Sequence, residues 1–189
     1  VWVKVGLIPA NGQAVIKMYY GNSEAVSESD GESVFEFFDD FEGSDVDPSK
    51  WSKNGTGTIT VGNSILTVTS YSGKAAYVSG LISLDLKNKI VEYKSKLGNT
   101  TGTRYEQALH VRKDDNNFIV IWNEGGSVNY NRIVFKMFGS YTAKDPAWPT
   151  SNEFRIYQII FKDNETVFKR DDRAEVYTLG ASNLSLIHI

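Results

Sequence analysis

Apolar and polar residues alternate with a period of two along most of the chain, whereas the spacing of an amphipathic helix is scarce. Successive strand residues point to opposite faces of a sheet, so this alternation predicts strands with one buried face. Clusters of Gly, Asn and Asp separate the runs as turn signals. Many short strands at regular spacing predict an all-β sandwich or barrel. The expected strands cover residues 2–5, 14–20, 57–61, 64–70, 76–79, 90–96, 105–112, 117–122, 132–138, 154–162 and 165–170.

A polar segment at residues 21–34, "GNSEAVSESDGESV", interrupts the alternation. It is rich in Ser, Gly and Glu and carries no periodic apolar residues, which is the composition of a connector. The two strands expected before it are too few to be stable alone. We therefore expect residues 1–30 to be the C-terminal remnant of an upstream β domain plus a connector, followed by a second domain over residues 31–183.

The end of the chain, "LSLIHI" at 184–189, matches one reading frame of a transposon-end adapter used in shotgun DNA sequencing. We therefore predict that this tail is an adapter translation, that the second domain lacks its last strand, and that His188 has no functional role. The alternative is a real edge strand, because Leu184, Leu186 and Ile187 are good strand residues.

The composition excludes several classes of function. Hydrophobic residues make up 41% of the chain and aromatic residues 13%, as in a globular protein. The net charge of −3 and the dispersed Lys and Arg argue against a nucleic-acid partner. No run approaches the roughly 20 apolar residues of a membrane-spanning helix, and the absence of cysteine excludes disulfides, thiolate metal sites and cysteine nucleophiles. Asn-x-Ser/Thr sequons give weak support for export and begin at Asn54, Asn99, Asn164 and Asn183.

Several stretches of the second domain resemble a known superfamily. "FFDDFEGSDVDPSKW" at 37–51 resembles the start of concanavalin A-like jelly-roll domains, the lectin and glucanase superfamily that includes laminin G-like domains. "GTGTITVGNSILTVTS" at 55–70, "KIVEYKSKLGN" at 89–99 and "FRIYQIIFKDNETVFKRDD" at 154–172 are similar to later strands of that fold. The resemblance implies an antiparallel two-sheet jelly-roll sandwich. It leaves the activity open, because this fold serves hydrolases, lectins and adhesive modules alike.

The start of the chain carries a second resemblance. "VWVKVGLIPANGQAVIKMYYGNSEA" at 1–25 resembles the end of a domain of unknown function found in archaeal and bacterial surface proteins, often directly upstream of such a jelly roll. This resemblance implies two extra strands from a truncated upstream domain. It also implies an extracellular or cell-surface location for the parent protein.

One acidic stretch has the spacing of a glycosidase site. Retaining β-glucanases of this fold carry two Glu with an Asp between them on one strand, and "ESDGE" holds Glu28, Asp30 and Glu32 at that spacing. However, the stretch lies in the polar connector, and the expected concave-sheet strands "EQALHVR" and "NFIVIW" hold no carboxylate pair. We therefore expect no catalytic site and no enzymatic activity in this chain.

A second acidic stretch carries the ligands that calcium prefers. Asp39, Asp40, Glu42 and Asp45 crowd one segment beside Gly43, and Ca²⁺ binds several carboxylate and carbonyl oxygens in a loop. Several jelly rolls of the superfamily that the chain resembles hold a structural calcium where the first strand meets the last. The stretch is therefore a candidate calcium site. The alternative is that its carboxylates cap strand ends and face water.

Two adjacent expected strands provide a platform for a sugar. Aromatic rings stack on the apolar face of a pyranose, and Arg, Asn or His side chains hydrogen-bond the hydroxyl groups. In "EQALHVR", at 106–112, Leu109 and Val111 are expected in the core. This register leaves His110 and Arg112 on the opposite face.

The next run, "NFIVIW" at 117–122, adds aromatic rings to that face. With Ile119 and Ile121 inward, Phe118, Val120 and Trp122 lie outward. A slip by one residue would reverse the faces and bury Trp122 in the core. The candidate ligand-binding residues of the platform are His110, Arg112, Trp122, Tyr130 and Arg132.

The stretch "SYTAKDPAWPTS" at 140–151 has no strand pattern. Trp148 lies between two prolines, and together with Tyr141 it is expected to form a stiff aromatic loop of the kind that carries binding residues. Tyr141 and Trp148 are therefore further candidate ligand-binding residues. The alternative for Trp148 is a hydrophobic lid that seals one end of the sandwich.

These patterns and resemblances predict a non-catalytic, lectin-like carbohydrate-binding module of an exported multidomain surface protein. Its expected partner is a polysaccharide or another glycan. The alternative is a structural or adhesive subunit of a surface layer or filament, in which an exposed sheet edge contacts neighbouring domains by strand addition. A glycoside hydrolase would need a carboxylate pair that the expected strands do not provide.

Overall fold

The computed structural model describes residues 2–71, 73–97, 107–123, 130–137, 139–149, 151, 153–163, 165–171, 173–177 and 187–188. The chain divides into two compact units. One comprises Val1–Val46 with Thr60–Thr67, and the other comprises Asp47–Ile59 with Val68–Ile189. Within the described residues, no helix is long and apolar enough to cross a lipid bilayer.

In the first unit, residues 2–30 form neither helix nor strand, so the strands expected at 2–5 and 14–20 are wrong. Their side chains stay in water: Val15 is 74% exposed and Tyr19 is 87% exposed. Two strands alone bury too little apolar surface to hold a hairpin together, and alternation by itself therefore produces no sheet here.

The connector of the first unit contains a short helix, α1 (Gly31–Val34). Directly after it, the ring of Phe35 stacks on Phe38 with centroids 5.7 Å apart. Phe35 also meets Trp2 edge-to-face at 5.8 Å. An aromatic cluster therefore joins the first residues of the chain to the residues that follow α1.

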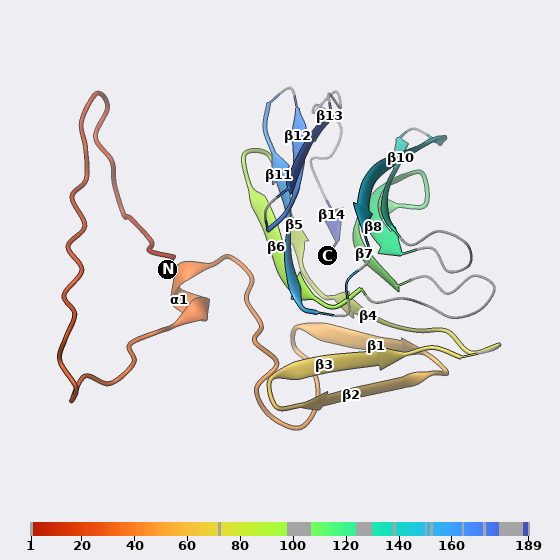
Figure 1. Cartoon of the computed structure of the whole chain (residues 1–189), viewed down its shortest axis with the longest axis horizontal. Coiled ribbons are helices and arrows are strands. Elements are labelled where there is room, and N and C mark those ends of the chain that lie inside the picture. Colours follow the sequence, from red (N-terminus) through yellow and green to blue (C-terminus); the bar gives the residue numbers. More distant parts are fainter. Residues whose placement is uncertain are drawn as a thin grey trace. The chain divides into compact units, whose positions relative to one another are not determined.

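Antiparallel strands make up most of the described chain, and the expected all-β sandwich is confirmed. The two large sheets, which lie next to each other in Figure 1, have the strand orders β10-β9-β8-β7-β14-β5 and β13-β12-β11-β6. Two smaller sheets pair β1 with β4 and β2 with β3. The strands are β1 (Trp51–Gly55), β2 (Thr58–Gly62), β3 (Ile65–Thr69), β4 (Ala76–Gly80), β5 (Ser83–Leu84), β6 (Ile90–Ser95), β7 (Gln107–Asp114), β8 (Asn117–Asn123), β9 (Tyr130–Met137), β10 (Ser140–Pro149), β11 (Arg155–Phe161), β12 (Thr166–Arg170), β13 (Arg173–Tyr177) and β14 (Ile187–His188).

The core of the sandwich lies between the two large sheets. Alternate residues of β8 and β9 supply one side of it: Ile119, Ile121, Ile133 and Phe135 are at most 3% exposed. The ring of Phe135 meets that of Phe168 on β12 edge-to-face, with centroids 5.3 Å apart and planes at 69°. This contact joins the six-stranded sheet to the four-stranded sheet at a geometry that aromatic pairs prefer.

The end of the chain forms a strand inside the six-stranded sheet. Ile187 pairs with Leu84 of β5, and His188 pairs with both Ser83 of β5 and Arg112 of β7. Ile187 and His188 therefore form a strand, as the alternative expects, although β14 lies within the sheet and not at its edge. The adapter origin of the tail stays a prediction.

Candidate functional site

Two of the expected platform residues, His110 and Arg112, lie on the outward face of β7. His110 lies opposite Val120, and Arg112 lies opposite Phe118. Residues directly opposite each other in an antiparallel pair share a face, so these positions lie on one side of the sheet. The intervening Val111 is 1% exposed and belongs to the core. The register expected for both strands is confirmed.

One row across this face alternates between cationic and aromatic residues. Arg112 on β7 pairs with Phe118 on β8. Lys136 on β9 pairs with both Phe118 and Tyr141, the latter on β10. Arg112 and Tyr141 are exposed, and the other two are half-buried. Neighbouring strands lie about 4.8 Å apart, so the backbones of the two cations are about 10 Å apart. These four residues are called the cation–aromatic row below.

The neighbouring row is apolar at its centre. Val120 lies between His110 and Val134, and both valines are 0% exposed, so a ligand does not reach them. The exposed ring of His110 is tilted at 38° to the ring of Phe118, with centroids 6.3 Å apart. Partial loss of water around the ring, together with the positive charge of Arg112, lowers the pKa of His110. At neutral pH it is therefore an uncharged hydrogen-bonding group.

The strand pairing also places the remaining candidate ligand-binding residues of the platform. Trp122 pairs with the half-buried Arg132, and Tyr130 pairs with Pro149. The side chains of Trp122 and Tyr130 lie outside the described residues, so their exposure stays a prediction. Lys136 is a residue that the sequence reasoning missed. The period of two could have identified Lys136, because this residue lies four positions after Arg132 on one strand and therefore on the same face.

The aromatic loop expected at 140–151 is largely a strand, and the candidate Trp148 is not at the surface. Ser140–Pro149 forms the edge of the six-stranded sheet, with a register shift between Lys144 and Trp148. An edge strand tolerates proline and irregular pairing. Residues 140–149 therefore lack the regular alternation from which the other strands were predicted. After the shift, Trp148 is 1% exposed and packs in the core. Trp148 is therefore a core residue, and its ring is not available to stack on a ligand.

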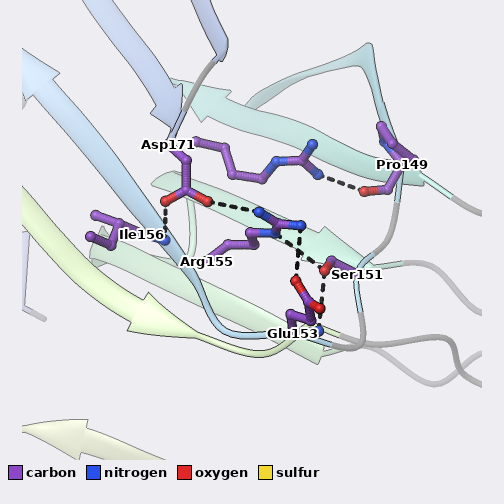
Figure 2. Close-up of polar contacts among 7 residues, drawn as sticks. Pro149, Ser151, Glu153, Arg155, Ile156 and Asp171 are labelled. Carbon is purple, nitrogen blue, oxygen red and sulfur yellow. Dashed lines mark hydrogen bonds and ion pairs between the residues drawn. The ribbon is translucent and has the colours of Figure 1, made fainter.

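A polar cluster links residues that follow β10, the start of β11 and the residue after β12 (Figure 2). Arg155 contacts Asp171 at 3.5 Å, Glu153 at 3.3 Å and the hydroxyl of Ser151 at 3.3 Å. Asp171 also accepts a hydrogen bond from the backbone N–H of Ile156 at 2.8 Å. Because these charged groups bind one another, the cluster ties the β12–β13 turn to β11.

In the acidic stretch considered for calcium, two carboxylates accept hydrogen bonds from backbone N–H groups. Asp39 and Asp45 each accept a hydrogen bond from a nearby backbone N–H, at 2.7 and 2.8 Å. Asp40 and Glu42 are exposed. Among the described residues, no three His, Asp or Glu side chains come close enough to share a metal ion.

Calcium binding here stays a prediction. Thermal unfolding with a chelator, and again after Ca²⁺ is added back, tests it: a bound ion raises Tm.

The stretch with glycosidase-like spacing does not lie on a strand. Asp30 caps α1 and accepts hydrogen bonds from the backbone N–H and the hydroxyl of Ser33, at 3.0 and 2.6 Å. These bonds hold the pKa of Asp30 below its usual value. Glu28 precedes the helix and Glu32 lies within it, so the three carboxylates share no sheet face.

Comparison with known proteins agrees with this fold. The described sandwich is similar to the crystal structure of an immunostimulatory antigen and pseudo-β-1,3-glucanase of Mycobacterium tuberculosis, with a TM-score of 0.61 and 14% sequence identity over 79% of this chain and 83% of that chain. At this identity the similarity shows the fold alone, which is a β-sandwich. A family described as a domain of unknown function (DUF2341) matches residues 1–54, beyond the boundary expected at residue 30. The comparison with curated proteins finds no match.

Proposed function

We propose that the sandwich is a non-catalytic, lectin-like carbohydrate-binding module of an exported, multidomain surface protein. The observation that carries the proposal is the cation–aromatic row on the outward face of the six-stranded sheet. Phe118 and Tyr141 offer apolar ring surface to a pyranose, and the two cations between and beside them donate hydrogen bonds to sugar hydroxyl groups. A row that crosses four strands suits an extended sugar chain.

The chemistry of the same face supports binding without hydrolysis. A retaining glycosidase needs two carboxyl groups about 5 Å apart. The cross-strand rows that contain His110 and Arg112 hold no Asp or Glu at their paired positions on β7 to β10. At the end of β7 and in the turn that follows, Asp114 accepts a hydrogen bond from the amide of Asn117, and Asp115 pairs with Arg112.

The comparisons support the carbohydrate-related part of the proposal. The M. tuberculosis protein of similar fold is described as a pseudo-β-1,3-glucanase. The match of residues 1–54 to the family described as a domain of unknown function supports a multidomain parent protein. A location at the cell surface is proposed from the resemblance of residues 1–25 to surface proteins.

Retention of the full chain on a panel of insoluble and soluble polysaccharides tests the proposal. We expect Phe118→Ala and Tyr141→Ala each to weaken retention roughly two- to tenfold through the loss of ring stacking. Tyr77→Ala is the matched control, because Tyr77 on β4 is 55% exposed and Tyr141 is 54% exposed. Retention that is unchanged in the first two variants, or equally reduced in the control, would contradict a site at the row.

A structural or adhesive subunit is the second candidate, and the burial of Trp148 favours it. One of the two aromatic residues expected in a surface loop packs in the core instead. In this role the edge strands β10 and β13 would pair with strands of neighbouring domains. A well-folded chain that self-associates and is retained on none of the polysaccharides would favour this candidate over sugar binding.

A further inference from the structure

We propose that the glycan recognised by the cation–aromatic row is acidic and carries carboxylate or sulfate groups along its chain. This inference rests on the proposed function and names the class of its ligand. Its basis is the position of Arg112 and Lys136 on alternate strands, with Phe118 between them. A sugar chain that crosses the strands would therefore meet a cation, a ring, a second cation and a second ring in turn.

The charge of this face is opposite to that of the whole chain. The net charge of the protein is −3, yet the charged residues at the described outward positions of β7 to β10 are Arg112, Arg132 and Lys136. Arg132 and Lys136 are four residues apart on β9, which is about 13 Å along a strand. Cations spread over such distances attract a polymer with repeated negative charges more strongly than one small anion.

Arg112 is accessible although it has an internal partner. It pairs with Asp115 in the β7–β8 turn, and the two side chains are 51% and 86% exposed. Exposed ion pairs are weak and screened by salt, so exchange of Asp115 for an anionic group of a ligand costs little. Arg155 is the contrasting case, because its guanidinium is held by two carboxylates and a hydroxyl (Figure 2).

The two cations of the row suit oxyanions in different ways. The planar guanidinium of Arg112 forms paired hydrogen bonds to a carboxylate or a similar oxyanion, whereas the ammonium of Lys136 acts as a point charge. Lys136 has aromatic residues, not carboxylates, as its cross-strand neighbours on both sides. A neutral glycan covering the row would remove water from both cations without supplying an opposite charge, which is unfavourable.

Calorimetric titration of the full chain with matched polymers tests this inference. The pairs are polygalacturonate with its methyl ester, and dextran sulfate with dextran, so that each pair differs in charge on one backbone. We expect the acidic member of at least one pair to bind more tightly, and its affinity to fall as NaCl is raised. Comparison of the two pairs distinguishes a carboxylate ligand from a sulfate ligand.

Charge variants locate the binding. Lys136→Gln and Arg112→Gln are each expected to weaken binding to the acidic polymer roughly two- to fivefold. Lys169→Gln removes the same charge from an exposed position on β12 of the other sheet and is expected to change nothing. An equal loss in Lys169→Gln would show attraction to bulk charge and overturn the inference.

The remaining outcomes separate the inference from the proposed function. Equal affinity for acidic and neutral polymers, still reduced by Phe118→Ala, would overturn the acidic ligand and keep sugar binding. Binding to none of the polymers, in a chain whose circular dichroism and cooperative unfolding show that it is folded, would overturn both.

Discussion

The guanidinium carbon of Arg170 lies 5.7 Å from the centre of the Trp148 ring. Both side chains are buried, at 5% and 1% exposed. Arg170 also donates from Nη1 to the carbonyl oxygen of Pro149 at 2.5 Å and hydrogen-bonds Tyr157. One arginine of β12 therefore contacts the end of β10 and a ring of β11 at the same place.

Replacing Trp148 by Ala removes this packing. We expect the free energy of unfolding, measured by urea denaturation, to fall by about 3–5 kcal/mol. Tyr141→Ala is the contrasting variant: its side chain is 54% exposed, and its removal should change stability by no more than about 0.5 kcal/mol. A Trp148→Ala variant that keeps its stability but loses polysaccharide retention would mean that the ring faces a ligand.

Tyr93 carries a hydroxyl that costs stability. Its ring stacks on Tyr157 with centroids 5.9 Å apart, and its buried hydroxyl has no hydrogen-bond partner among the described residues. Burial raises the pKa of Tyr93 well above its usual value, so the group stays protonated. We expect Tyr93→Phe to raise the free energy of unfolding by about 1 kcal/mol, because stacking remains and an unsatisfied group is lost.

Tyr157→Phe is the control for this effect. It removes a hydroxyl that hydrogen-bonds Arg170, so we expect a loss of about 1 kcal/mol in the same urea experiment. If Tyr93→Phe destabilised the protein to a similar extent, the hydroxyl of Tyr93 would have to be satisfied in solution, and the prediction would be wrong.

Asp171 stabilises the turn between β12 and β13. Its carboxylate accepts the backbone N–H of Ile156 at 2.8 Å and contacts Arg155 at 3.5 Å. We expect Asp171→Ala to lower the free energy of unfolding by about 1–2 kcal/mol, since a backbone donor and a cation lose their shared acceptor. Asp163→Ala breaks an exposed pair with Lys87 and is expected to cost less than about 0.5 kcal/mol. Equal costs in chemical denaturation would refute this difference.

His110 gives a pH dependence with a defined sign. Its pKa is lowered from 6.5 in the folded chain, so the unfolded chain binds more protons as the pH falls through that value. The contribution of His110 is therefore complete above about pH 6.5 and is lost progressively below it. We expect the urea midpoint of the wild type to drop more between about pH 7.5 and about pH 5 than that of His110→Gln. Parallel pH curves for the two proteins would contradict desolvation of this ring.

Alternation of apolar and polar residues predicted a strand correctly where neighbouring strands are present to pair with it. Alternation at 117–122 predicts a strand with Ile119 and Ile121 inward, and β8 (Asn117–Asn123) has that register. Alternation at 14–20 predicts a strand equally well, yet the residues there form none. The difference is pairing: β8 lies between β7 and β9, whereas the described chain provides no strand beside residues 14–20. Strand propensity is expressed only where pairing and burial support it.

By itself, the sequence determined the all-β class, the core positions of β7 and β8, and the outward positions of His110 and Arg112, because all of these follow from the period of two. Only the tertiary structure decided that Trp148 turns inward and that the cation–aromatic row forms. The period assigns a residue to a face, but the strand register and its irregularities decide which residues become neighbours. The shift between Lys144 and Trp148 is one such irregularity. Such shifts depend on pairing between distant segments, which a local pattern does not contain.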